Sequence, residues 1–307
     1  MRKPNAVTSS PLSSAWRLGT LAPAGVGLAL FVALVQIRMD EPWSSGVLLA
    51  VATVPALLLV ADGLAVARND GAPRAAVTVL LVAGLLLAAV TIGRLAQVLG
   101  SDEVGGGGTL TWTLALFTAV AAYCYARSGS VACLLLASLA AVGLLLAAVN
   151  WVFGTEDVDT YRALLAFSFV VLFGAGLAVA GRPGTVLVGA AGVTVLAGSY
   201  GTGLLFLFFP GGANLGWGWE LVTLVEGLAL LAYAGLRLEP GPAYLAFFVL
   251  VVFVTTAAVS GSSAGGLVLD GSGGEDSSPS LVGWPLAVAI ATAAAAAWGT
   301  RAALRER

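Results

Sequence analysis

Apolar residues fall into ten long, continuous runs, which are separated by short segments rich in glycine, proline and charged residues. The runs cover about 18–37, 46–67, 75–98, 109–126, 130–153, 161–180, 184–209, 217–236, 243–260 and 281–300. A run of about 20 residues, at 1.5 Å per residue, crosses the roughly 30 Å hydrocarbon core of a bilayer as a helix. The runs do not alternate every second residue, as the strands of a membrane barrel would. The pattern therefore predicts an all-α, polytopic transmembrane helix bundle of about ten spans.

The composition supports a protein that is stable only in lipid. Of its 307 residues 59% are hydrophobic and 10% are charged, and the mean hydropathy is +0.98, whereas soluble domains carry about 25% charged residues. The first run ends in "VALVQIRMDE" without a small-x-small cleavage site, so we interpret it as a retained span. We expect one integral membrane domain over 1–307, with a cytoplasmic segment at 1–17, a flexible outer loop at 261–280 and a cytoplasmic tail at 301–307.

The basic residues predict the orientation. With the N-terminus in the cytoplasm, most lysines and arginines lie on the cytoplasmic side. These are Arg2, Lys3, Arg17, Arg68, Arg74, Arg127, Arg182, Arg237, Arg301, Arg305 and Arg307. Only Arg38, Arg94 and Arg162 fall on the outer side. Because basic residues flanking spans stay on the cytoplasmic side, we expect a multi-pass plasma-membrane protein with both termini cytoplasmic.

Several function classes are excluded by what the sequence lacks. The chain has no histidine, which excludes histidine-based zinc sites and Ser–His triads. There is no basic patch for nucleic acid and no nucleotide-binding motif for an ATP-driven pump. Cys124 and Cys133 are interpreted as small packing residues. We therefore expect no cofactor, no metal and no enzymatic activity. The expected partners are the lipid bilayer and a small-molecule or ion substrate, and the sequence identifies no protein partner.

Glu226 is the most informative residue, because it lies in the middle of the run "WELVTLVEGLALLAYAG" at 219–235. Nine residues separate it from Trp217, which is about 13–14 Å along a helix and close to the bilayer midplane. A charged side chain there costs about 2.5–3.5 kcal/mol on insertion scales, so Glu226 should face protein or water.

One face of the helix at 217–236 carries most of its polar atoms. Trp219, Thr223, Glu226, Leu230 and Tyr233 follow spacings of 4, 3, 4 and 3 residues and share that face. We expect this face to point into the bundle. Two interpretations of Glu226 remain open, namely a working residue on a wetted ion or substrate pathway, or a neutral, hydrogen-bonded structural residue.

The segment "GSYGTG" at 198–203 precedes that helix and contains Gly198, Tyr200, Gly201 and Gly203. Glycine weakens helix continuity, and transporters place broken helices along binding cavities. The alternative is close helix packing through small residues spaced four apart, and we favour it. Either way, these residues are candidates for the wall of a substrate or ion pathway.

Asp62 is the second acid within an apolar run, and it lies six residues, or about 9 Å, before Arg68. Acids near the ends of spans reach water or an arginine at little cost, so structural pairing is the favoured interpretation. Asp62 remains a further candidate for the pathway.

The overall organisation resembles two kinds of membrane protein. Ten spans with both termini inside are similar in topology to the drug/metabolite transporter superfamily, without its repeat motifs. Arginine-only cytoplasmic edges and "EPGPAYL" between two spans resemble multi-pass proteins of GC-rich actinobacteria, a likeness that implies no activity. The acidic pair in "MDEPW" looks like the first outer loop of lipid-linked-sugar glycosyltransferases.

Three functions follow from these features. The first is a secondary transporter or permease of a small solute, with Glu226 as the coupling or binding residue. The second is a non-catalytic membrane scaffold or accessory subunit with a dry interior. The third and weakest is an outer-face glycosyl or lipid transferase that uses the outer carboxylates.

Overall fold

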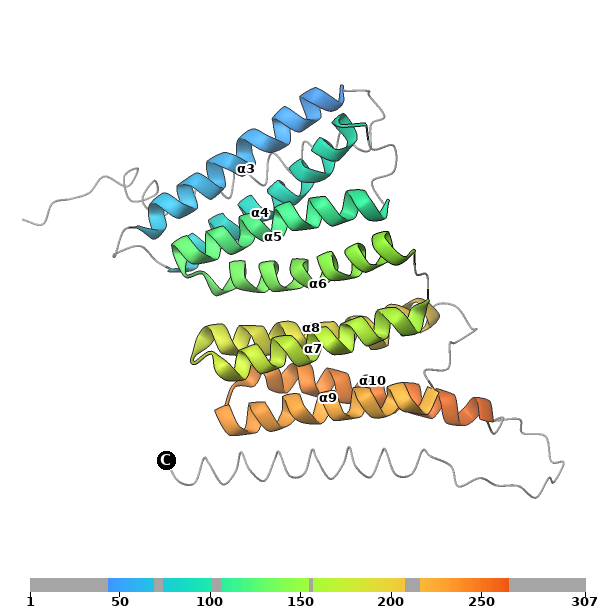
Figure 1. Ribbon diagram of the computed structural model, residues 1–307. Helices are drawn as coiled ribbons and strands as arrows, with labels where there is room; N and C mark the ends of the chain where they lie inside the picture. Colours follow the sequence, from blue (N-terminus) through green and yellow to red (C-terminus); the bar gives the residue numbers. More distant parts are fainter. Residues whose placement is uncertain (1–43, 69–73, 101–105, 155–156, 208–215, 265–307) are drawn as a thin grey trace, which may run out of the picture. The chain divides into compact units, whose positions relative to one another are not determined.

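The computed structural model describes residues 44–68, 74–100, 106–154, 157–207 and 216–264, and every regular element within them is an α-helix. The helices are α3 (Ser45–Ala67), α4 (Arg74–Val98), α5 (Gly107–Ser128), α6 (Val131–Phe153), α7 (Val158–Ala178), α8 (Arg182–Leu207), α9 (Gly216–Arg237) and α10 (Pro240–Ala264) (Figure 1). They confirm the eight predicted runs from 46–67 to 243–260. The first and tenth runs, 18–37 and 281–300, lie outside the described residues.

Local backbone chemistry explains where several helices end. α5 and α6 are each followed by a glycine in the left-handed region, Gly129 with φ 65° and Gly154 with φ 59°. Each of these glycines donates its N–H to a carbonyl four residues earlier, at 2.8 Å, which satisfies one of the open carbonyls of the last turn. Only glycine reaches this backbone region without strain, so the turns after α5 and α6 are set by sequence.

Six of the described helices are long and apolar enough to cross a bilayer. They are Gly46–Ala67, Arg74–Val98, Gly107–Ser128, Val131–Phe153, Val158–Ala178 and Gly218–Arg237. α10 contributes a shorter apolar stretch, Pro240–Val251. These six helices indicate a multi-pass membrane protein.

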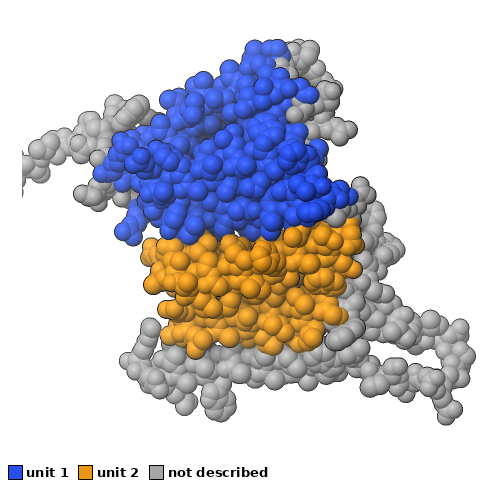
Figure 2. Space-filling model, viewed as in Figure 1, with its two compact units in different colours: residues 1–155 blue, residues 156–307 orange. Residues whose placement is uncertain are grey.

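The chain divides into two compact units, Met1–Thr155 and Glu156–Arg307 (Figure 2). In the first unit α3 packs on α4 and α5 packs on α6, and α4 joins the two hairpins by contacting α5. Leu81, Leu85, Cys124 and Cys133 are fully buried in its core. Both cysteines are free thiols, which confirms their interpretation as packing residues.

The described part of the second unit also forms two hairpins, α7 with α8 and α9 with α10, and α8 contacts both helices of the other hairpin. Its core draws buried side chains from all four helices. They include Phe169, Val188, Val195, Leu230, Tyr233 and Val249. Phe169 stacks on Phe173 with ring centroids 5.3 Å apart, and Phe173 meets the edge of Tyr233 at 6.1 Å. This aromatic chain ties α7 to α9.

Large apolar side chains also lie on the outer faces of each unit. Leu57 and Leu58 on α3, Val170 on α7 and Phe247 on α10 each expose more than half of their surface. Exposed apolar surface of this extent is costly in water. These faces are suited to contact with lipid.

α7 and α8 approach closely where two glycines face each other. A Cβ added to Gly176 would lie 2.6 Å from Val188 Cγ2 and 2.8 Å from the Gly184 carbonyl oxygen. Both distances are below van der Waals contact. The neighbouring Gly174 differs, because a Cβ added there meets nothing within 4 Å.

We predict that Gly176→Ala destabilises the protein by about 1–3 kcal/mol, the usual cost of overpacking. The control Gly174→Ala should be neutral, or stabilising by up to about 1 kcal/mol, because alanine is the better helix former. The measurement is the thermal unfolding midpoint of each purified variant in the same detergent. Equal midpoints for the two variants would contradict the close packing of α7 on α8.

Candidate functional site

A small polar cavity lies within the second unit, among α7, α8 and α9. Its volume is about 20 Å³, and it is partly open. One water molecule needs about 10–15 Å³ by the same kind of measure, so the cavity has room for about one water. The lining consists of Arg162, Leu165, Ala166, Thr194, Val195, Gly198, Ser199, Trp219, Val222, Thr223 and Glu226.

The cavity reaches from one end of the unit toward its middle. α7 and α9 begin at this end, where α8 finishes. Arg162 lies four residues after the start of α7, or about 6 Å along it, and Glu226 lies ten residues after the start of α9, or about 15 Å. Since α9 is about 33 Å long, Glu226 sits near its midpoint.

Glu226 is buried, with 8% of its surface exposed. Thr223, Leu230 and Tyr233 on the same helix face are buried as well. This confirms that the predicted face of 217–236 points into the protein. Among the described residues, no hydrogen bond or ion pair joins the Glu226 carboxyl to another side chain. The cavity is therefore the polar environment of this carboxyl.

Three hydroxyl groups also line the cavity, and each donates its hydrogen to its own helix. Thr194 donates to the Ala191 carbonyl at 2.7 Å, Ser199 to the Val195 carbonyl, and Thr223 to the Trp219 carbonyl at 2.9 Å. A hydroxyl has one hydrogen and two lone pairs. Thr194 and Thr223 can thus offer lone pairs, and no hydrogen, to anything in the cavity.

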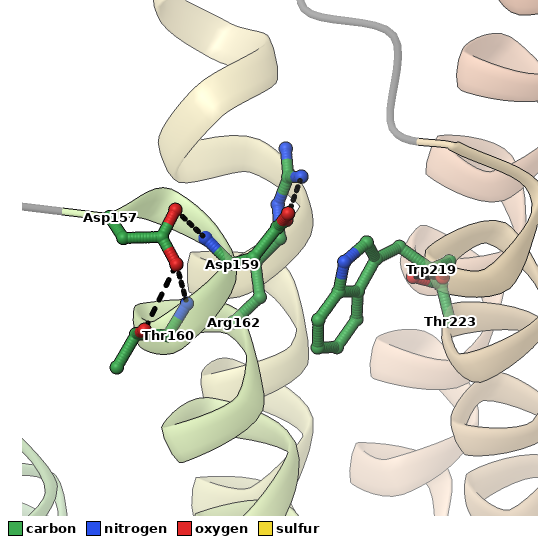
Figure 3. Close-up of polar contacts among 6 residues, drawn as sticks. All are labelled: Asp157, Asp159, Thr160, Arg162, Trp219 and Thr223. Carbon is green, nitrogen blue, oxygen red and sulfur yellow. Dashed lines mark hydrogen bonds and ion pairs between the residues drawn. The ribbon is translucent and has the colours of Figure 1, made fainter.

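Arg162 is the residue that sequence reasoning missed. Its position near the start of a span suggests a side chain that extends toward water, and Arg94 of α4 does donate to the exposed Gln97 at 2.8 Å. Arg162 is instead buried, and its Nη1 lies 3.1 Å from Asp159 Oδ1. Figure 3 shows this pair on α7 and the indole of Trp219 extending toward Arg162 from α9.

The signal for Arg162 was present in the spacing of α7. Asp159, Arg162, Ala166 and Phe169 are three to four residues apart, so they share a helix face. Phe169 is buried in the core and Arg162 is buried too, whereas Asp159 at the start of the helix is exposed. The cavity consequently has the Arg162 guanidinium near the end of the unit where α7 begins, and the Glu226 carboxyl deeper inside the unit.

The structure brings together some of the predicted site residues. Glu226, Thr223 and Gly198 line the same cavity. Tyr233 is buried in the apolar core of the unit instead, where it contacts Phe173, and it does not line the cavity.

The glycine-rich segment does not break its helix. α8 is continuous from Arg182 to Leu207, so residues 198–203, including Tyr200, Gly201 and Gly203, are helical. The broken-helix interpretation of "GSYGTG" was therefore wrong. Glycine costs a helix only about 1 kcal/mol relative to alanine, and hydrocarbon strongly favours a backbone whose hydrogen bonds are all made internally. Gly198 packs near Leu165 of α7, where an added Cβ would make an ordinary contact at 3.5 Å.

Asp62 lies on α3 in the first unit and is exposed. Among the described residues it forms no ion pair with Arg68. Its predicted structural pairing is therefore not seen with that arginine. The role of Asp62 in a substrate or ion pathway stays a prediction.

Asp157 has a structural role at the start of α7. Its carboxylate accepts hydrogen bonds from the backbone N–H groups of Asp159 and Thr160, at 3.3 and 3.2 Å, and from the Thr160 hydroxyl at 3.0 Å (Figure 3). These bonds, chiefly the one from the Thr160 hydroxyl, lower the pKa of Asp157 below its ordinary value. Asp157 thus caps the helix that carries Arg162.

The comparisons with known proteins identify no relative: no family model matches the chain, and no curated protein or solved structure resembles it significantly. Function therefore has to be inferred from the cavity and the helices that form it.

We predict that Asp157→Ala lowers the thermal midpoint at neutral pH and that the difference from wild type shrinks in acid. The folded-state pKa is the lower one, so the stabilisation is complete above the unfolded-state pKa, about 4, and disappears as the pH falls through the folded-state value. Asp157→Asn, a neutral cap, is the matched control and should respond less to pH. A deficit in Asp157→Ala that stays constant with pH would contradict the charged cap.

Proposed function

We propose that this chain is a secondary transporter or permease of a small solute, and that Glu226 binds the coupling proton or cation. The observation that carries the proposal is a buried carboxyl near the middle of a membrane-length helix. It lines a cavity that hydroxyl groups and an arginine also line, and it has no partner among the side chains that the structure describes. An acid inside a membrane protein is costly and is usually retained for function. The orientation that goes with this proposal is the one the arginines predict, with both termini cytoplasmic and the cavity nearer the outer surface.

The volume of the cavity suits the coupling ion and not the transported solute. About 20 Å³ has room for one water and not for an organic solute, whose sites usually measure several hundred Å³ in total. In this proposal the cavity is the ion-binding part of the transporter, and the solute contacts other surfaces during the transport cycle.

The same small volume favours the second candidate, a non-transporting scaffold or accessory subunit. A buried acid and a buried arginine around one trapped water also suit a static polar cluster that fixes how three helices pack. The two functions differ in whether bulk water and ions reach Glu226.

The first test is the reactivity of a cysteine placed at Thr223, one helical turn from Glu226 and in the cavity lining. We expect a membrane-impermeant thiol reagent to label Thr223→Cys in intact cells, because in this proposal the transport cycle opens the cavity beyond the one-water volume seen here. The unmodified chain is the blank, since Cys124 and Cys133 are fully buried.

Two further positions on α9 serve as controls for that test. Val225→Cys lies at similar depth on an exposed, apolar face and should resist the reagent, because lipid disfavours the reactive thiolate. Gly218→Cys, in the first turn and with free space around its Cβ, should be labelled readily. An unlabelled Thr223→Cys beside a labelled Gly218→Cys would favour the scaffold.

The second test is transport by cells that express the full chain. The probes are radiolabelled amino acids and sugars for uptake, and a lipophilic cationic dye for efflux. We expect Glu226→Gln to reduce the flux of the transported probe to the level of cells without the protein, because the amide cannot exchange a proton or bind a cation.

The matched control is Glu239→Gln, since Glu239 follows α9 and is not part of the cavity lining. Its flux should equal that of the wild type at equal protein level in the membrane. Normal flux in Glu226→Gln would remove Glu226 from the mechanism, and no flux of any probe in the wild type would count against transport.

A further inference from the structure

The chemistry of the cavity lining restricts what it can bind. Thr194 and Thr223 have committed their hydrogens to backbone carbonyls and present only lone pairs. The Glu226 carboxyl lines the same cavity, and no hydrogen bond or ion pair joins it to another of the described side chains. A species in this cavity therefore either donates hydrogen bonds to the two hydroxyl oxygens or is a cation that they coordinate. Water does the former, and it also has a lone pair left to accept a hydrogen from a protonated carboxyl.

The groups around Glu226 suit a proton better than a metal cation. Arg162 of α7 lines the same cavity and is permanently charged, and Asp159 of α7 pairs with it at 3.1 Å. The described side chains of α8 and α10 that pack near α9 add no charge, since α8 offers hydroxyls and α10 an exposed Tyr244. On α9 itself, Glu220 lies about 9 Å toward the start and Tyr233 about 10 Å beyond. Hard metal cations take about six or more oxygen ligands, whereas a proton needs one carboxylate oxygen and one water. The described lining offers the Glu226 carboxyl and a few hydroxyl oxygens, which suits the proton.

We propose that Glu226 binds a proton, through one water held by Thr194 and Thr223, and exchanges it with the aqueous phase at the end of the unit where α9 begins. This inference rests on the proposed function and names its coupling ion. In the exchange, a hydronium ion in the cavity gives its proton to the Glu226 carboxylate, which leaves a neutral carboxylic acid and a water. The reverse step returns the proton to water, so atoms and charge balance.

The neutral acid completes the hydrogen bonds of the site. Its O–H donates to the water, and the water donates one hydrogen to Thr194 Oγ1 and one to Thr223 Oγ1. The acid O–H, the water and the two threonine oxygens are then joined by hydrogen bonds, as burial favours. With Glu226 ionised, the same water can turn and donate a hydrogen to the carboxylate. One water thus serves both protonation states.

The test is infrared difference spectroscopy on the full chain reconstituted in lipid, comparing acidic with alkaline buffer. We expect a protonated-carboxyl C=O band that titrates with pH, shifts in heavy water and is lost in Glu226→Gln. Glu239→Gln should retain the band. Thr194→Val and Thr223→Val, which keep the side-chain shape and remove the acceptor, should each shift its frequency.

The pH titration of the band also distinguishes the ions. We expect its midpoint to be the same in sodium, ammonium and bulky organic-cation buffers. A midpoint that moves toward acid in sodium or ammonium would overturn the proposal, because that cation would then compete with the proton. The absence of any titrating band that Glu226→Gln removes would overturn it too, and Thr223→Val with an unshifted band would exclude the water bridge.

These outcomes are separable from those of the transport test. A titrating Glu226 band together with normal flux in Glu226→Gln would leave the proton site standing and reject its coupling to transport. Lost flux in Glu226→Gln together with a sodium-dependent titration would keep the transporter and reject the proton as its coupling ion.

Discussion

The constraint on which this structure depends is that hydrocarbon offers no hydrogen-bond partners, so every polar group has to be satisfied by the protein itself. The backbone meets it by forming helices. Most hydroxyls meet it in the same way, by donating to a carbonyl of their own helix, as Thr53 does to Leu49 and Ser168 to Leu164. Buried exceptions among the described residues include the hydroxyl oxygens of Thr91 and Thr118, which have no partner.

Unlike most of the hydroxyls, the Glu226 carboxyl does not form a hydrogen bond with a carbonyl of its own helix. A carboxyl placed near the middle of a span costs about 2.5–3.5 kcal/mol on insertion scales. In the folded protein the polar face of α9 points inward, and a water-sized cavity lies beside the Glu226 carboxyl. The neighbouring hydroxyls are oriented by the same local bonds found elsewhere in the chain, so they present lone pairs to that space as a consequence of helix chemistry.

The features that sequence predicted are those set by local periodicity. The eight described helices start and end within four residues of the predicted runs, because run length and the glycines after α5 and α6 are local signals. The inward face of α9 followed from its spacing. The burial of Arg162 did not follow, because it depends on how α7 packs against α8 and α9. The broken-helix alternative for "GSYGTG", which was not the favoured one, was wrong, since glycine is a weaker helix breaker where unpaired backbone groups are so costly.

The position of Arg162 makes the two ends of the cavity chemically different. Its guanidinium is held by Asp159, whose carboxylate is mostly exposed, while Glu226 lies about 9 Å deeper along the helix direction. From its end toward its middle, the cavity is therefore lined first by Arg162, which is paired with Asp159, and then by the hydroxyl oxygens and the acid. Asp157 fixes the start of α7 and with it this pair. A capping residue at the start of α7 thereby helps to fix where the Arg162 charge lies relative to the Glu226 carboxyl.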